Sequence, residues 1–331
     1  MSDRGQNSLA VRWSKLKHAM LFRVRKLLDW RTSADAAKRN GLVLRLADRM
    51  GRGTGRLRFL DHLRPMRRNT TLTLDAYLEG DLGAIWVGHA TMLLRVGGKT
   101  ILTDPVFHPR VGLGYGIGTL GPRRFQAPAI TIEQLPPLDL ILVSHGHFDH
   151  LDRPSLRKIA RRFGDVPVRS ADGVGDLLDD LKFSDVREMK WGETAEVAGI
   201  RLTSLEVKHW GPRVFFDDWR SFCAFKLEAG SHRVIFGADT AETDLFQGLG
   251  PVDLMCVGIG AYDPYVAAHA TPEQAWQMTR DAEARHVAAM HHSTFRLSHE
   301  PMDEPLKRLL TVAGDEASRI VIRNVGDVWT A

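Results

Sequence analysis

The residues with the clearest potential for chemistry form the hexapeptide HGHFDH at positions 145–150, directly after the apolar run DLILVS. Alternation along an extended segment places His145 and His147 on one side, two residues apart. Asp149 and His150 follow where the chain turns toward the next element. Imidazole and carboxylate groups together suit zinc, iron or manganese. The spacing therefore predicts a metal site at the carboxyl end of a strand, with a chance cluster of surface histidines as the alternative.

Further candidate ligands stand at the ends of other strand-like runs, and two metal ions would need them. His209 follows LTSLEVK, Asp239 follows RVIFGA and His291 follows HVAAM. A carboxylate can bind two cations through separate oxygens, which favours Asp239 for a bridging position. His292 competes with its neighbour His291 for the last position. Taken singly, His209 can be a packed loop histidine and Asp239 a turn residue, but their shared placement favours a metal site.

The apolar runs predict an α/β protein in which strands and helices are interleaved, and two sheets flanked by helices are the arrangement that this order suggests. The Gly97-Gly98 turn joins two predicted strands into a hairpin, at residues 84–96 and 99–106. Further strands are predicted at residues 139–144, 200–207, 222–227, 234–236, 254–259, 287–290 and 320–322. Helices are predicted at residues 154–163, 172–181 and 272–284.

Residues 112–121, with the sequence GLGYGIGTLG, form a glycine-rich segment. The segment lacks both the ordered glycine spacing and the following lysine of a phosphate-binding loop. We therefore expect a flexible flap rather than a nucleotide site.

The composition is that of a globular protein, with 44% hydrophobic and 26% charged residues among 331. No apolar run is long enough to cross a bilayer, and the first residues do not resemble a secretory signal. The two cysteines, Cys223 and Cys256, lie in apolar strand-like stretches, where buried free thiols are expected. These features predict a cytoplasmic protein.

Charge divides the chain into a predicted basic arm at residues 1–70 and a predicted domain at residues 71–331. The arm holds 18 Lys and Arg against 5 Asp and Glu, whereas the rest holds 27 against 35. An acidic body argues against nucleic acid as a partner. The arm contains an amphipathic pattern that can dock on an anionic membrane or pack on the body, and a mobile tail or a transit peptide is a further alternative. The pattern consists of Trp13, Leu16, Met20, Val24 and Leu27.

With these motifs in place, the sequence resembles the metallo-β-lactamase superfamily of metal-dependent hydrolases. The closer resemblance is to the branch of N-acylphosphatidylethanolamine-hydrolysing phospholipase D and ascorbate-phosphate lactonases. Besides HGHFDH and the GADT motif, it rests on WVGHAT at 86–91, LTDPV at 102–106, GPRRF at 121–125, PPLD at 136–139, KHW at 208–210, GIGAY at 258–262 and MHHSTF at 290–295. The resemblance implies an αββα sandwich with the metal ions at one edge of its two sheets.

The resemblance also implies a ligand set for two divalent metal ions. One ion would be held by His145, His147 and His209. The other would be held by Asp149, His150 and His291, with Asp239 bridging the two. Zinc is the preferred metal, and iron and manganese are alternatives because the same ligands accept all three.

Four other roles follow from the same motifs. Asp149 would also be catalytic, taking up the proton of the attacking water. His269 matches a histidine that these phospholipases place near the substrate phosphate; a histidine that merely flanks a helix is the alternative. His89 and Asp104 match positions that support the site without binding metal, and a carboxylate such as Asp104 can orient a ligand imidazole.

The implied function is phospholipase D-type hydrolysis of N-acylphosphatidylethanolamine-like lipids to an N-acylethanolamine and phosphatidic acid, by a homodimer peripheral to the membrane. A hydrolase of soluble lactones or sugar phosphates is the main alternative, because fold and metal ions do not determine the substrate. A non-catalytic scaffold with the same fold is a third hypothesis, disfavoured because all seven candidate ligands are present.

Overall fold

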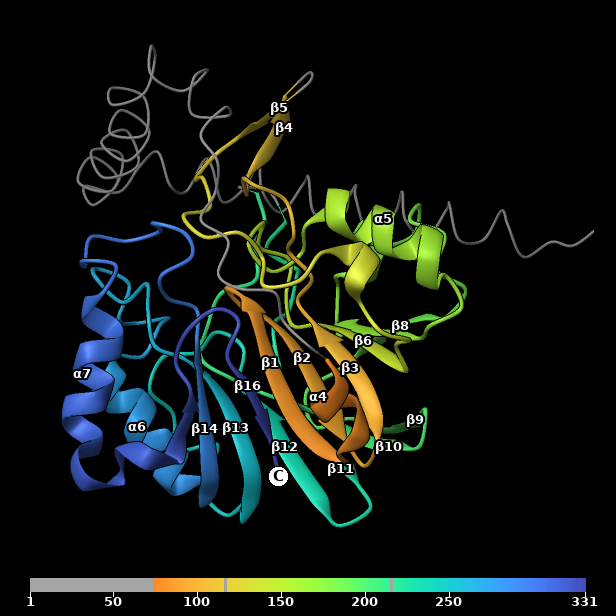
Figure 1. Cartoon of the computed structure of the whole chain (residues 1–331). Helices are drawn as coiled ribbons and strands as arrows, with labels where there is room; N and C mark the ends of the chain where they lie inside the picture. The colour runs from red at the N-terminus through yellow and green to blue at the C-terminus, as the bar shows by residue number, and fades with distance from the viewer. Residues whose placement is uncertain (1–73, 116–117, 215–216) are drawn as a thin grey trace, which may run out of the picture. The chain divides into compact units, whose positions relative to one another are not determined.

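The computed structural model of the chain describes residues 74–115, 118–214 and 217–331. The predicted arm at residues 1–70 lies outside the described residues. Two mixed sheets face each other in the described part of the chain, and helices lie along their outer sides (Figure 1). This is the expected αββα sandwich. None of the helices described is both long and apolar enough to cross a membrane.

The first sheet has the strand order β16-β1-β2-β3-β6-β7-β8. Its first four strands are antiparallel, and β3, β6, β7 and β8 run parallel. The strands are β1 (Leu82–Gly88), β2 (Thr91–Val96), β3 (Lys99–Thr103), β6 (Leu140–Val143), β7 (Val168–Ala171), β8 (Val186–Met189) and β16 (Val328–Thr330).

The second sheet has the strand order β15-β14-β13-β12-β11-β10-β9. Strands β9 to β12 form antiparallel pairs, whereas β12 to β15 run parallel. The strands are β9 (Thr194–Val197), β10 (Ile200–Leu205), β11 (Ala224–Ala229), β12 (His232–Phe236), β13 (Val252–Gly258), β14 (Ala284–Met290) and β15 (Ile320–Ile322).

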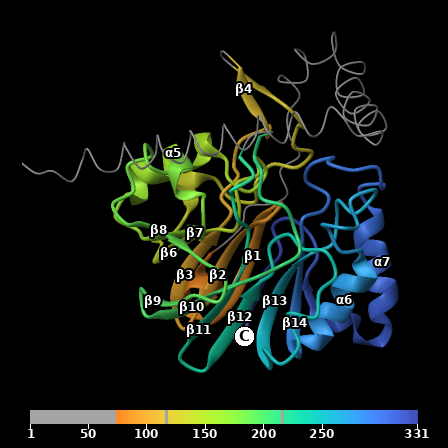
Figure 2. The same ribbon diagram turned by 180° about the vertical axis from the view of Figure 1, so that it is seen from behind.

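Helices close the two outer faces. α6 (Pro272–Asp281) and α7 (Glu304–Ala313) pack on the second sheet through a separate apolar cluster, and α5 (Arg153–Phe163) lies beside the first sheet (Figures 1 and 2). Asp152 and Thr271 accept hydrogen bonds from the first turns of α5 and α6, which satisfies backbone donors there. The remaining helices are α4 (Asp75–Glu79) and the short 3-10 turns Ile132–Gln134, Gly175–Leu177 and Gly314–Arg319.

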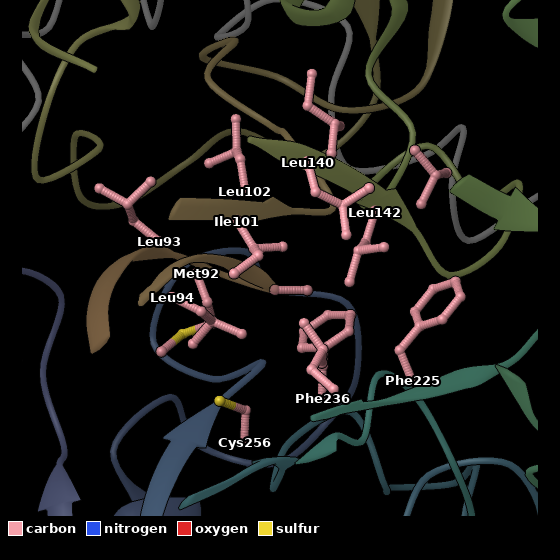
Figure 3. Packing of buried hydrophobic residues seen from close by; sticks show 14 of the residues in the cluster. Met92, Leu93, Leu94, Ile101, Leu102, Leu140, Leu142, Phe225, Phe236 and Cys256 are labelled. Carbon is pink, nitrogen blue, oxygen red and sulfur yellow. The ribbon is translucent and has the colours of Figure 1, made fainter. Parts of the chain in front are cut away.

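The main core lies between the sheets. Figure 3 shows Met92, Leu94 and Ile101 pointing toward Phe225, Phe236 and Cys256 of the second sheet. All six side chains are fully buried. Both cysteines are free and buried, as predicted. Because apolar side chains of both sheets share this core, the edges of the two sheets are held in one fixed arrangement.

The functional segments all follow strands that point the same way within their sheet. β1, β3 and β6 share one direction in the first sheet, and β10, β12 and β14 share one direction in the second. Their carboxyl ends therefore meet at one edge of each sheet, which is where open α/β sheets place ligands.

Three sequence predictions differ from the structure. The strand predicted at residues 84–96 is broken at His89 and Ala90, where the chain reverses between β1 and β2. The strand predicted at residues 99–106 ends at Thr103. The helix predicted at residues 172–181 is only a 3-10 turn, because Gly173 adopts a positive φ and the Gly175 N–H donates to the Glu188 carboxylate instead of a helical carbonyl.

The glycine-rich segment is more regular than a flap. β4 (Leu113–Tyr115) pairs with β5 (Gly118–Leu120) in a two-stranded antiparallel sheet of its own. It projects away from the two main sheets (Figure 1). The prediction of a flap therefore missed two paired strands, because the many glycines in this segment give no strand pattern in the sequence.

Replacing Leu142 with alanine tests the core between the sheets. Leu142 in β6 is fully buried, so Leu142→Ala should lower the free energy of unfolding by about 3 kcal/mol. Denaturant unfolding at constant metal content measures the change. Val312→Ala on α7, where the side chain is 38% exposed, is the control and should cost less than about 0.5 kcal/mol. Equal effects of the two substitutions would contradict this account of the core.

Candidate metal centre

The predicted ligands converge at the carboxyl ends of strands from both sheets. The first trio, which we define as His145, His147 and His209, gathers its ring nitrogens closely. The His145 Nε2 and His147 Nδ1 atoms are 2.9 Å apart, and the His209 Nε2 atom is 3.3 Å from the same His147 atom. Two of these rings come from the loop after β6 and one from the segment after β10. Their atoms lie within 4.8 Å of one another, which is a metal-binding geometry.

The second trio, which we define as Asp149, His150 and His291, forms beside the first. The His291 Nε2 atom is 3.2 Å from the His150 Nε2 atom and 3.4 Å from the Asp149 Oδ2 atom. His150 and His291 are fully buried, and the Asp149 side chain is 16% exposed. β6 and β14 belong to different sheets, so only the stacking of the sheets brings this trio together.

Asp239 lies between the two trios. Its Oδ2 atom is 3.0 Å from the His150 Nε2 atom and 3.2 Å from the His291 Nε2 atom. The same oxygen is 3.8 Å from the His209 Nε2 atom and 4.0 Å from the His145 Nε2 atom. One buried carboxylate thus faces ring nitrogens of both trios, which is the placement that a bridging ligand requires.

His269 and Trp210 lie over this cluster. The His269 Nδ1 atom is 3.8 Å from the Asp239 Oδ2 atom, so the ring reaches the cluster and does not merely flank α6. Trp210 stacks on the His209 ring at 4.7 Å between centroids and is also near His147 and His269. Because Trp210 is 41% exposed, it forms part of the rim between the cluster and solvent.

His89 and Asp104 contact the predicted ligands Asp149 and His150. The His89 Nε2 atom is 2.8 Å from the Asp149 Oδ2 atom. The Nδ1–H of His150 donates to the Asp104 carboxylate at 2.6 Å, which directs the opposite ring nitrogen into the cluster. Both residues thus lie where a supporting role requires.

His291 and His292 separate clearly in the structure. The His291 ring faces Asp149 and Asp239, whereas the His292 ring packs on Trp86 at 4.7 Å between centroids. The His292 Nδ1 atom is 2.9 Å from the Ser293 Oγ atom. The geometry therefore favours His291 as the last member of the cluster.

Three residues near the cluster were missed or given no role by sequence reasoning. The Ser144 hydroxyl donates to Asp104 and is 2.9 Å from the His145 Nδ1 atom. Arg213 donates to the carbonyl oxygens of Gly146 and Leu151 at 2.6 and 2.9 Å, at either end of the hexapeptide, and lies over the Phe148 ring. Trp210 had been noted only as part of a motif. An isolated arginine or serine carries no spacing signal, so no pattern could have found the first two.

The donor set fits divalent metal ions. Burial lowers the pKa of His145 well below its usual value and lowers the pKa of His147 and His209 to about 4. The first trio is therefore neutral near pH 7, as metal ligation demands. The His147 Nε2 and Asp239 Oδ1 atoms are buried and have no hydrogen-bond partner among the described residues. Closely spaced nitrogens and carboxylate oxygens of this kind suit zinc, iron or manganese.

Charge in the second trio points to the same conclusion. Burial acts to raise the pKa of Asp149 and Asp239, but His150 and His291 hold the pKa of both carboxyls well below its usual value. Against the effect of burial, these carboxylates raise the pKa of His291 to about 9 and that of His150 well above its usual value. The buried carboxylates thus demand positive charge beside them, which protons or divalent cations can supply.

Comparison with known families shows to which family the chain belongs. A model of the beta-lactamase superfamily domain matches residues 99–292. The chain belongs to the metallo-β-lactamase superfamily of hydrolases. The resemblance seen in the sequence motifs is therefore confirmed, and the matched region contains the two trios, Asp239 and His269.

Relatives of this superfamily member include named phospholipases. An uncharacterised protein of Mycobacterium tuberculosis is 30% identical over 251 residues, which cover 73% of this chain and 66% of that protein. An N-acyl-phosphatidylethanolamine-hydrolyzing phospholipase D of Caenorhabditis elegans is 29% identical, covering 78% of each chain. A mitochondrial protein of the same description from Saccharomyces cerevisiae is 31% identical, covering 69% of this chain and 51% of its own length.

Solved structures confirm the fold of this family member. A possible metal-dependent hydrolase from Veillonella parvula superposes with a TM-score of 0.61 at 18% identity, covering 76% of this chain and all of that one. A diiron β-hydroxylase from Streptomyces venezuelae superposes with a TM-score of 0.56 at 20% identity, covering 76% of this chain and 54% of its own. The same sandwich thus hosts different reactions, so the fold alone does not identify the substrate.

Asp104→Asn should weaken metal binding without unfolding the protein. Asparagine replaces a carboxylate oxygen that accepts from both His150 and Ser144, so the His150 ring loses its orientation. We expect the affinity for zinc to fall about 10- to 100-fold. Competition with a chelator measures it, and circular dichroism monitors the fold. Asp315→Asn, at an exposed position, is the matched control. An unchanged zinc affinity in Asp104→Asn would contradict the supporting role.

Proposed function

We propose that the cluster binds two divalent metal ions and hydrolyses a phosphodiester bond of phospholipids. In this proposal the first trio holds one ion, the second trio holds the other, and Asp239 bridges them. Zinc is the preferred metal because imidazoles dominate the donor set, with iron and manganese as alternatives. The observation that carries the proposal is the single carboxylate facing ring nitrogens of both trios.

The substrate assignment draws on the relatives. Two proteins that align with most of this chain are described as N-acyl-phosphatidylethanolamine-hydrolyzing phospholipases D. A reaction of this type would release an N-acylethanolamine and leave phosphatidic acid. The proposal has three further parts. Residues 1–70 dock on an anionic membrane, the protein is cytoplasmic and peripheral to that membrane, and it forms a homodimer.

His269, Asp149 and Trp210 would each have a role in this reaction. Divalent metal ions, when bound, would lower the pKa of an attacking water and stabilise charge on the phosphate oxygens. Burial lowers the pKa of His269 to about 3, so its neutral ring can donate one hydrogen bond to a phosphate oxygen. Asp149, whose Oδ2 atom is 2.8 Å from the His89 Nε2 atom, would receive the proton of the water. Trp210, which is exposed at the rim, would contact the lipid as substrate enters the site or product leaves it.

Headgroup release tests the reaction. The purified, metal-loaded protein should convert N-acylphosphatidylethanolamine in mixed micelles to N-acylethanolamine and phosphatidic acid, detected by mass spectrometry. Asp149→Asn should lose activity by on the order of 100-fold or more, because a ligand and proton acceptor are removed together. Asp315→Asn is the control. If the protein contains about two metal ions and cleaves no phospholipid, the substrate assignment is wrong, and soluble lactones and sugar phosphates become the substrates to test.

A pair of histidine variants tests the ligand set. His291→Ala removes a ring that faces Asp149 and Asp239, and should lower the bound metal from about two ions to about one. His292→Ala removes a ring packed on Trp86, and should lower thermal stability while leaving the metal content unchanged. Elemental analysis after dialysis gives the metal content. The reverse outcome, with metal lost only from His292→Ala, would overturn the assignment of His291.

A further inference from the structure

An exposed apolar face stands on the small β4–β5 hairpin. Leu113 and Leu120 are direct cross-strand partners, so their side chains lie on the same face. They are 54% and 56% exposed, and Phe125 beyond the hairpin is 52% exposed. The hairpin extends away from both main sheets, and the view from behind shows the same projection (Figures 1 and 2). Exposed leucines paired on a projecting element are unusual for a surface that meets only water.

The hairpin has a specific base and is not a loose loop. Gly112 and Gly121 face each other with positive φ angles. A Cβ atom at either glycine would lie 2.1 Å from the Leu120 carbonyl oxygen or 2.0 Å from the Val111 carbonyl oxygen. Only glycine permits this close approach of the two strands. The leucine pair is therefore held at a defined position, as the first pair of the ladder beside this closed base.

The base of the hairpin rests on the wall of the metal cluster. Val111 packs with Phe295 and Phe148, and Phe148 belongs to the hexapeptide that carries four of the proposed ligands. The Phe295 ring meets the His89 ring edge-on at 5.1 Å. The Phe125 N–H donates to the carbonyl oxygen of Thr294. A surface that holds the hairpin therefore also lies close to the cluster.

The charged side chains in the sequence segment that carries the hairpin have one sign. Residues 105–131 contain no Asp or Glu and include Arg110, Arg123 and Arg124. Of these three, Arg110 and Arg124 are buried and donate to backbone carbonyls, whereas Arg123 is partly exposed near the base of the hairpin, with the two leucines farther out. The order matches a phospholipid layer, in which phosphates lie at the surface and acyl chains lie beneath.

We propose that the β4–β5 hairpin inserts Leu113 and Leu120 into a phospholipid surface, with Arg123 at its base at the level of the lipid phosphates. The lipid is then delivered beside the metal cluster without leaving the layer completely. This inference rests on the proposed function for its biological purpose, but not for its test. A second copy of the chain is a poorer occupant, because stable protein interfaces bury about 1,200–2,000 Å², whereas the described residues of the hairpin and its flank offer three large exposed apolar side chains, Leu113, Leu120 and Phe125.

A single-cysteine label tests insertion directly. The chain has two cysteines, both buried, so a cysteine introduced by Leu120→Cys can be labelled selectively with an environment-sensitive fluorophore. Vesicles of phosphatidylcholine with phosphatidylglycerol should shift its emission to the blue, and acyl-chain quenchers should reduce it. Val312→Cys on α7, 38% exposed, is the matched control and should respond to neither. A label at position 120 that ignores vesicles overturns the proposal.

A serine pair tests the contribution of the leucines. Leu113→Ser combined with Leu120→Ser removes apolar area without changing charge, and should weaken vesicle binding by about tenfold or more. Activity on substrate embedded in vesicles should fall in proportion, whereas activity on a short-chain monomeric substrate should stay at the wild-type level. Unchanged vesicle binding of the full-length double variant would overturn the proposal and assign membrane contact to another part of the chain.

The outcomes separate this inference from the proposed reaction. Vesicle insertion without phospholipid hydrolysis would support the hairpin and refute the reaction. Micellar hydrolysis without a response of the label would support the reaction and refute the hairpin. A label whose emission changes with protein concentration in the absence of lipid would show that a second copy covers the face, and would likewise refute lipid insertion.

Discussion

The rest of the site depends on the buried charge of Asp239, whose carboxylate is almost completely buried at the junction of two sheets. A buried charge is costly unless groups of opposite charge surround it. The Nε2 atoms of His150 and His291 lie 3.0 and 3.2 Å from one Asp239 oxygen. Asp104 in turn directs the His150 ring, and Asp149 lies close to the His291 ring. Asp239, His150, His291 and Asp149 are thus one electrostatic unit, in which the loss of His150 or His291 leaves buried carboxylates with less compensation.

The sandwich makes this unit possible by joining the carboxyl ends of strands from two sheets. The second trio combines residues after β6 of one sheet with a residue after β14 of the other. Apolar packing between the sheets, through side chains such as Ile101 and Phe236, holds those ends in register. The core therefore acts on function through geometry, since a shift of one sheet against the other would separate ligands that no local sequence connects.

Several residues of the site and their neighbours have an unusual backbone conformation. Asp104 and His291 adopt positive φ angles although neither is glycine, and so do His89 and Ala238, the neighbour of Asp239. Such conformations cost about 1–3 kcal/mol each and persist only where the surroundings enforce them. Here the surrounding hydrogen bonds, including the Ser144 N–H to Asp104 and the His89 N–H to Thr294, enforce them. Stability is given up locally so that the strand ends turn their side chains toward the cluster.

Local patterns in the sequence determined most of the strands, α5, α6 and the seven candidate ligands, because a strand followed by clustered histidines is a short-range signal. They failed at His89, where a long-range bond to Thr294 supports a reversal inside an apolar run, and at residues 172–181, where glycines and Glu188 replace a helix. Only the tertiary structure shows that the His291 ring faces Asp239 while the His292 ring packs on Trp86, that Ser144 and Arg213 contact the cluster region, and that Asp239 lies between the trios. The physical reason is distance along the chain: the sequence specifies donor types at each strand end, but which donors face one another depends on how two separately formed sheets pack.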